Sequence, residues 1–141
     1  MSGKESGTTD KIIAIDFDGC ICSNNWPDIG SPNWNVINRA KDEQQTGAKL
    51  ILWTCREGPS MSAAVNACKS WGLTFDAVNS NLSSAKAKYG NDTRKIGATE
   101  YWDDRAVRMD ETYIYDGQNQ SGKVARQRVK RQKSTRGQVN R

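Results

Sequence analysis

Acidic residues follow an apolar segment near the start of the chain, where they could do chemistry. Residues 11–15 read KIIAI, and Asp16 and Asp18 come directly after them in the sequence DFDG. A second acidic pair, Asp103 and Asp104, follows the segment TEYW later in the chain. Carboxylates can act as nucleophiles, transfer protons and hold divalent metal ions. The candidate chemistry is therefore based on carboxylates.

The chain contains no histidine, and this absence excludes several common mechanisms. A Ser-His-Asp triad, a Cys-His pair and an HExxH metal site all require one. The cysteines are expected to be reduced thiols, because the sequence shows no signal peptide. Cys20 and Cys22 are expected to be small buried residues rather than zinc ligands, because histidine is absent and no second pair has zinc-ligand spacing. The four cysteines are Cys20, Cys22, Cys55 and Cys68.

Short apolar segments predict the strands that must position the acidic residues. We expect strands over residues 11–15, 49–54, 74–78, 96–102 and 112–115. Segments that are apolar throughout are typical of strands buried on both faces of a parallel sheet. The strand ends then present Asp16, Thr54 and Asp103 at the same edge of the sheet, where ligands of such folds bind.

Helices are expected between these strands. We expect one from Ser31-Pro32 to near Gly47, one from Ser60 to Gly72, and a loop with a short helix over residues 79–94. Alternating strands and helices predict an α/β fold, a Rossmann-like open parallel sheet with helices on both faces.

Carboxylates that gather at one sheet edge repel one another, so a cation is expected among them. Oxygen-only ligands and the need to neutralise a phosphate favour Mg²⁺.

The motifs also resemble a known family, the haloacid dehalogenase (HAD) superfamily. DFDG after an apolar strand resembles its first motif, and Thr54 at the end of LILWT resembles the second. Lys95 resembles the third motif, and Asp103-Asp104 the fourth. More narrowly, DFDGCI, LILWTCREG and RKIGATEYWDDRAV resemble small phosphatase-like members without a cap domain that occur in bacteria and phages. The resemblance covers residues 11–108.

The resemblance implies a Mg²⁺-dependent phosphomonoester hydrolase that acts through an aspartyl-phosphate. Asp16 would attack phosphorus, and Asp18 would protonate the leaving oxygen and then deprotonate a water molecule. The Asp16 carboxylate, the Asp18 carbonyl and Asp103 would hold the ion, with Asp104 beside it or linked through water.

Thr54 and Lys95 would bind the phosphoryl oxygens in the same scheme. Lys86 and Lys88 compete with Lys95 for this role. Arg56, two residues after Thr54, fits either a substrate contact or a surface ion pair.

The spacing of the motifs leaves no room for a cap domain. Residues 20–53 and 55–94 are already occupied by helices and their connections, so we expect an open site. Among HAD members an open site often accompanies large substrates such as proteins or nucleic acids, or oligomers whose subunits close one another's sites. Nucleotides and nucleic-acid ends are therefore the candidate substrates.

The charge of the chain is unevenly distributed. Residues 1–116 hold 13 Lys and Arg against 16 Asp and Glu, whereas residues 117–141 hold 8 basic residues and no acidic one. We expect a flexible leader over residues 1–10, a catalytic domain over residues 11–116 and a basic, disordered tail over residues 117–141. Eight cations favour contact with nucleic-acid phosphates, and a solubilising or unselected basic end is the alternative. One alternative to a hydrolase is thus a nucleic-acid-binding protein with little turnover. Another is a phosphotransferase, because hydrolysis and phosphotransfer share the aspartyl-phosphate.

The sequence shows neither a secretory signal nor an apolar segment of the ~18 residues that a membrane span needs. A cytoplasmic location is expected, or the host cytoplasm for a phage protein.

Overall fold

The computed structural model describes residues 10–117. The chain divides into two units with a boundary after Asp104, and each unit is described by itself. The predictions for the leader and the basic tail fall almost entirely outside the described residues. Within residues 10–117, the helices are all too short or too polar to cross a membrane.

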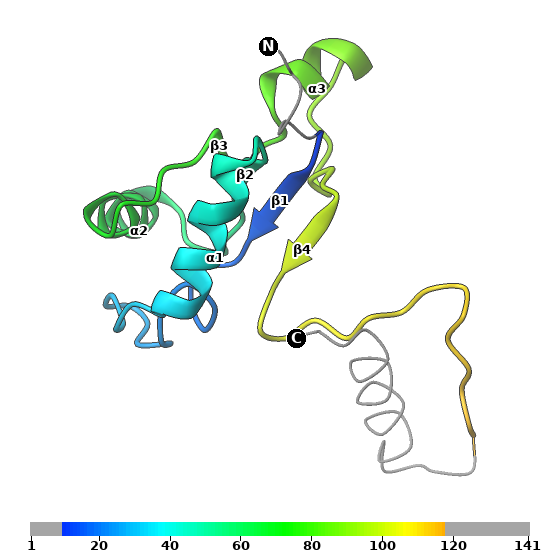
Figure 1. The fold of residues 1–141 in the computed structure, drawn as a ribbon, viewed down its shortest axis with the longest axis horizontal. Coiled ribbons are helices and arrows are strands. Elements are labelled where there is room, and N and C mark those ends of the chain that lie inside the picture. Colours follow the sequence, from blue (N-terminus) through cyan, green and yellow to red (C-terminus); the bar gives the residue numbers. More distant parts are fainter. Residues whose placement is uncertain (1–9, 118–141) are drawn as a thin grey trace. The chain divides into compact units, whose positions relative to one another are not determined.

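The first unit contains a four-stranded parallel sheet with the strand order β3-β2-β1-β4 (Figure 1). The predicted α/β fold with an open parallel sheet is therefore confirmed. Strand β1 lies between β2 and β4, and Ile15 at its end is paired with Leu52 and Trp102. The strands are β1 (Ile12–Ile15), β2 (Lys49–Leu52), β3 (Ala77–Val78) and β4 (Glu100–Trp102).

Alternate residues of the two central strands pack on opposite faces of the sheet. Ile13 and Ile15 of β1 pack with Leu50 and Leu52 in the larger core cluster, which also contains buried residues of two helices. Ala14 packs in a smaller cluster on the other face, together with Ile51, Ile96 and Leu82. The apolar character of both strands follows from this double burial.

Three helices connect the strands: α1 (Trp34–Gln45), α2 (Gly58–Ser70) and α3 (Ser83–Tyr89). Ile37 and Ala40 of α1 and Ala64 and Cys68 of α2 are buried in the larger cluster. The segment that contains α3 packs Leu82 on the other face. The two long helices therefore cover one face of the sheet, and a shorter segment covers the other.

Both long helices begin at residues other than those predicted. The side chain of Asn33, and not that of Ser31, caps α1 by accepting a hydrogen bond from the Val36 N–H. Pro32 is instead held in an antiparallel bridge with Cys22, so the helix begins after it. Helix α2 begins at Gly58, before the predicted cap Ser60.

The predicted helix ends are confirmed. Helix α1 ends two residues before Gly47, and α2 ends two residues before Gly72. Both glycines have the positive φ that favours glycine after a helix.

The second unit is described over residues 105–117. The predicted strand over residues 112–115 is wrong, because residues 111–112 form a turn and residues 113–116 have no regular secondary structure. The side chain of Asp110 accepts a hydrogen bond from the Thr112 N–H, and its carbonyl accepts one from the Tyr113 N–H. These local bonds occupy backbone groups that a strand would pair across a sheet.

Candidate active site

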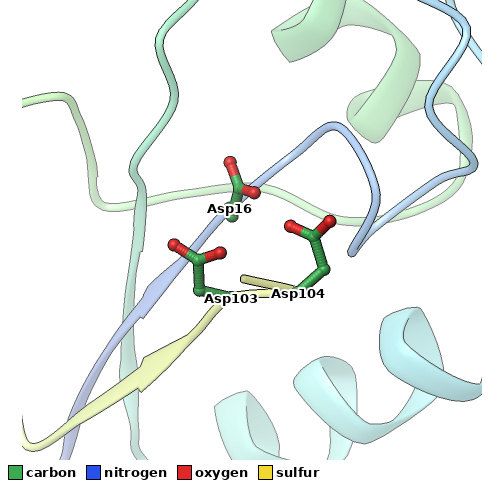
Figure 2. A group of neighbouring side chains, drawn as sticks. All are labelled: Asp16, Asp103 and Asp104. Carbon is green, nitrogen blue, oxygen red and sulfur yellow. The ribbon is translucent and has the colours of Figure 1, made fainter. Parts of the chain in front are cut away.

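Three carboxylates meet where the strand order of the sheet reverses. The chain runs outward from β1 through β2 to β3 and then returns to the other side of β1 as β4. The Asp16 N–H donates to the Trp102 carbonyl at 2.9 Å, which joins the ends of β1 and β4. The carboxylates of Asp16, Asp103 and Asp104 each offer an oxygen within 4.8 Å of the others (Figure 2). A reversal of strand order is the usual ligand position in open α/β sheets.

The electrostatics of this acidic cluster, Asp16, Asp103 and Asp104, favour positive charge. The pKa of Asp16 is raised to about 7 by burial, by a hydrogen bond with the Asp104 side chain and by the charge of Asp103. Ionising all three groups therefore costs free energy, which a bound cation would offset. Three carboxylates also form the oxygen-only ligand set that Mg²⁺ prefers.

Gly19 allows Asp104 to approach the DFDG segment closely. Its φ is +87°, and a Cβ atom at this position would collide with the Asp104 carboxylate. The glycine is therefore favoured by the backbone conformation, and it leaves the space that the Asp104 carboxylate occupies.

Asp18 lies outside the acidic cluster and is paired with Arg56. The Arg56 Nε donates to Asp18 Oδ2 at 2.9 Å, and Nη2 donates to Oδ1 at 2.8 Å. The remaining guanidinium contacts are with main-chain carbonyls: Nη1 donates to Pro27 at 3.2 Å and Ser60 at 3.3 Å, and Nη2 donates to Asp28 at 2.8 Å. Hydrogen bonding to Asp18 raises the pKa of Arg56. Of the two interpretations of Arg56 from sequence, the structure shows the ion pair, and it is buried.

Two aromatic rings flank the Arg56 guanidinium. Its Cζ lies 5.0 Å from the centroid of the Phe17 ring and 4.9 Å from that of Trp26. The Arg56 side chain is only 1% exposed, whereas Trp26 is 58% exposed. The arginine is thus enclosed between a core residue and a surface residue.

Thr54 follows the carboxyl end of β2, which is paired with β1, and an unpredicted residue fixes it there. The Asn79 side-chain amide accepts from the Thr54 N–H at 2.8 Å and donates to the Thr54 carbonyl at 2.9 Å. The Thr54 hydroxyl oxygen accepts from the Arg56 N–H at 3.0 Å. Asn79 has a φ of +51°, a conformation that asparagine tolerates better than most residues. The sequence feature that could have predicted this role of Asn79 is its position directly after β3.

Two of the three candidate lysines, Lys88 and Lys95, lie over aromatic rings. Lys86 and Lys88 lie on α3, which Figure 1 shows beyond the amino-terminal end of β1, whereas Asp16 follows its carboxyl end. The Lys88 Nζ lies over the Tyr89 ring, and the Lys95 Nζ lies 5.8 Å from the centroid of the Tyr101 ring. Which lysine binds a phosphate stays a prediction.

Asn81 organises the segment that carries Lys95 and was also missed from sequence. This buried side chain donates to Asp92 Oδ1 at 2.8 Å and accepts from the Gly97 N–H at 2.7 Å. Like Asn79, it follows β3, so both polar residues after this strand fix neighbouring loops.

The cysteines are free thiols, as expected, and all except Cys55 are buried. The Cys20 Sγ lies 3.7 Å from the Trp102 carbonyl oxygen. Burial and the neighbouring Asp16 carboxylate raise the pKa of Cys20 to about 12. A thiol held in its protonated form is neither a nucleophile nor a metal ligand.

Comparison with known proteins shows a likeness of fold. A solved structure of a conserved protein coded by a locus of Bacteroides thetaiotaomicron is 29% identical and superposes with a TM-score of 0.62. The match covers 84% of this chain and 93% of that chain. No family model matches the sequence, and no curated protein does. The likeness supports the α/β fold, and the catalytic roles of the site residues stay predictions.

Proposed function

We propose that this chain is a Mg²⁺-dependent phosphomonoester hydrolase that acts through an aspartyl-phosphate on Asp16. The observation that carries the proposal is the acidic cluster at the reversal of strand order, with Asp18 two residues after Asp16. An acid at this spacing suits a reaction whose leaving oxygen needs a proton.

The residues of the site fit a magnesium ion by their chemistry. Asp16, Asp103 and Asp104 would hold it with carboxylate oxygens, and the Asp18 carbonyl would complete the protein ligands. When bound, the ion supplies positive charge that offsets both the crowded carboxylates and the phosphate.

The chain's own groups would carry out two displacements. A carboxylate oxygen of Asp16 forms a bond to phosphorus while the ester O–P bond breaks, and Asp18, carrying a proton on a lone pair that Arg56 does not use, gives that proton to the leaving oxygen. Asp18 then takes a proton from water, which attacks phosphorus, releases phosphate and restores Asp16. The Thr54 hydroxyl oxygen accepts from the Arg56 N–H, so its hydrogen is available to a phosphoryl oxygen.

The candidate substrates are nucleotides and nucleic-acid ends. The described segments between the motifs hold α1, α2 and α3 with their connections, and these are too short to include a cap domain. An open site of this kind suits a large or polymeric phosphate ester. The 8 basic residues after position 116 would attract a polynucleotide.

The central test is turnover of 4-nitrophenyl phosphate with and without Mg²⁺. Asp16→Asn is expected to lower kcat by at least ~10³-fold because it removes the nucleophile. Asp42→Asn, at an exposed position on α1, is the matched control and is expected to be neutral. Equal turnover by wild type and Asp16→Asn would overturn the proposal.

The basic segment favours a second candidate, nucleic-acid binding with little turnover. This function predicts binding that weakens steeply with salt, survives Asp16→Asn and disappears when residues 117–141 are deleted. Unchanged affinity after the deletion would contradict it. Added alcohols in the phosphatase assay test the phosphotransferase alternative, because a transferase would form new phosphate esters.

A further inference from the structure

Arg56 has no donor left for a substrate. A guanidinium has five N–H donors. In Arg56, two are directed at Asp18 and three at the carbonyls of Pro27, Asp28 and Ser60. The side chain is also 1% exposed. A phosphate could reach this arginine only if several of these bonds broke.

The paired bonds set the orientation of the Asp18 carboxylate. Nε and Nη2 bind one oxygen each, so the carboxylate cannot rotate without losing a bond. The Phe17 and Trp26 rings flank the guanidinium and restrict its movement. A group that transfers a proton gains rate from being held in one geometry before reaction.

The same arginine links Asp18 to two other segments. Its bonds to Pro27 and Asp28 reach the loop before α1, and its bond to Ser60 reaches the first turn of α2. A buried ion pair is often no more stabilising than apolar residues of the same volume. A gain in stability is therefore a weak explanation for this ion pair. A fixed orientation of the Asp18 carboxylate explains it better, because that orientation can serve a function.

We propose that Arg56 is a positioning residue that orients the Asp18 carboxylate for proton transfer and ties it to the loop at residues 26–28. This inference rests on the proposed hydrolase function. In this inference Arg56 does not contact the substrate but acts on the reaction through Asp18.

A double-mutant cycle on kcat tests the inference, with 4-nitrophenyl phosphate, Mg²⁺ and enough enzyme to follow slow variants. Arg56→Lys is expected to lower kcat by about 10-fold or more with a much smaller change in KM. In an Asp18→Asn background the same substitution is expected to lower kcat by less than about 2-fold. Equal losses in both backgrounds would overturn the proposal. A raised KM with unchanged kcat would overturn it in favour of substrate binding.

A second cycle covers the case in which Arg56→Lys does not fold. Trp26→Ala removes an exposed ring from the outer side of the guanidinium and leaves the core intact. It is expected to lower kcat by about 3-fold, and only when Asp18 is present. Trp34→Ala, which removes a similarly exposed ring that lies near Lys41, is the matched control. An equal loss from Trp26→Ala in both backgrounds would refute the proposal.

Asp16→Asn separates this inference from the function on which it rests. If Asp16→Asn abolishes turnover while both cycles are additive, the hydrolase function stands and the role of Arg56 fails. If Asp16→Asn retains full turnover, the hydrolase function itself fails.

Discussion

Two aspartates only two residues apart lie in opposite electrostatic environments. Asp16 shares its space with Asp103 and Asp104, and its pKa is raised to about 7. Asp18 is bound through both oxygens by the buried guanidinium of Arg56. Like charges are gathered where a cation can bind, and opposite charges are paired where a side chain needs a fixed orientation. One short segment thus holds one carboxylate among like charges and another carboxylate fixed by an opposite charge.

The largest expected effect comes from removing a charge of the acidic cluster. Asp103→Asn should raise the Mg²⁺ concentration needed for half-maximal turnover by ~10²-fold or more, since it removes a direct ligand. Turnover measured against Mg²⁺ concentration tests this expectation, with Asp42→Asn as the control. An unchanged Mg²⁺ requirement would exclude Asp103 as a ligand.

Breaking the ion pair should have a large effect on stability. Asp18→Ala leaves the Arg56 charge buried without its carboxylate, and should lower the free energy of unfolding by about 3 kcal/mol. Urea unfolding measures the change. Asp16→Ala, measured in EDTA at pH 8, should be neutral or stabilising because it removes a like charge. If both variants lose the same stability, the contrast between the two environments is not real.

Gly19→Ala should have an intermediate effect, because it strains the backbone and displaces Asp104. We expect a loss of about 2 kcal/mol in unfolding free energy together with weaker Mg²⁺ binding. Gly90→Ala is the matched control: Gly90 has a φ of +79°, and its Cβ would meet nothing within 4 Å. It should lose stability through strain alone and keep its Mg²⁺ affinity. Equal Mg²⁺ affinities in the two variants would argue against Asp104 in the site.

The smallest expected effect is a pH dependence of stability without metal. The ordinary pKa of Asp16 is 3.8, and the folded protein raises it to about 7, so the folded state binds this proton more tightly. Its contribution to stability is therefore full below pH 4 and is lost as the pH rises to about 7. Thermal unfolding in EDTA should show Asp16→Asn more stable than wild type at pH 8, with a smaller difference at pH 5. A difference independent of pH would contradict the raised pKa.

The sequence predicted the sheet and its acidic edge because these depend on local patterns. Apolar segments that end at Asp16, Thr54 and Asp103 are sufficient to bring these residues to one edge of a parallel sheet. The partner of Asp18 was not predicted, since Arg56 is 38 residues away and its burial depends on the loop around Pro27.

Polar contacts between distant segments also explain the other differences. Asn79 holds Thr54 across 25 residues, and the bridge between Cys22 and Pro32 shifts the start of α1. The strand predicted over residues 112–115 failed for the reverse reason, because a local turn at Asp110 outweighed an apolar pattern.

The loop bonds of Arg56 end on peptide oxygens, which every amino acid possesses. The side chains of Asp28 and Ser60 are therefore not needed for the arginine to hold Asp18. Substitutions at these two positions can therefore change the side chains that surround Arg56 while the main-chain bonds that hold it against Asp18 are kept.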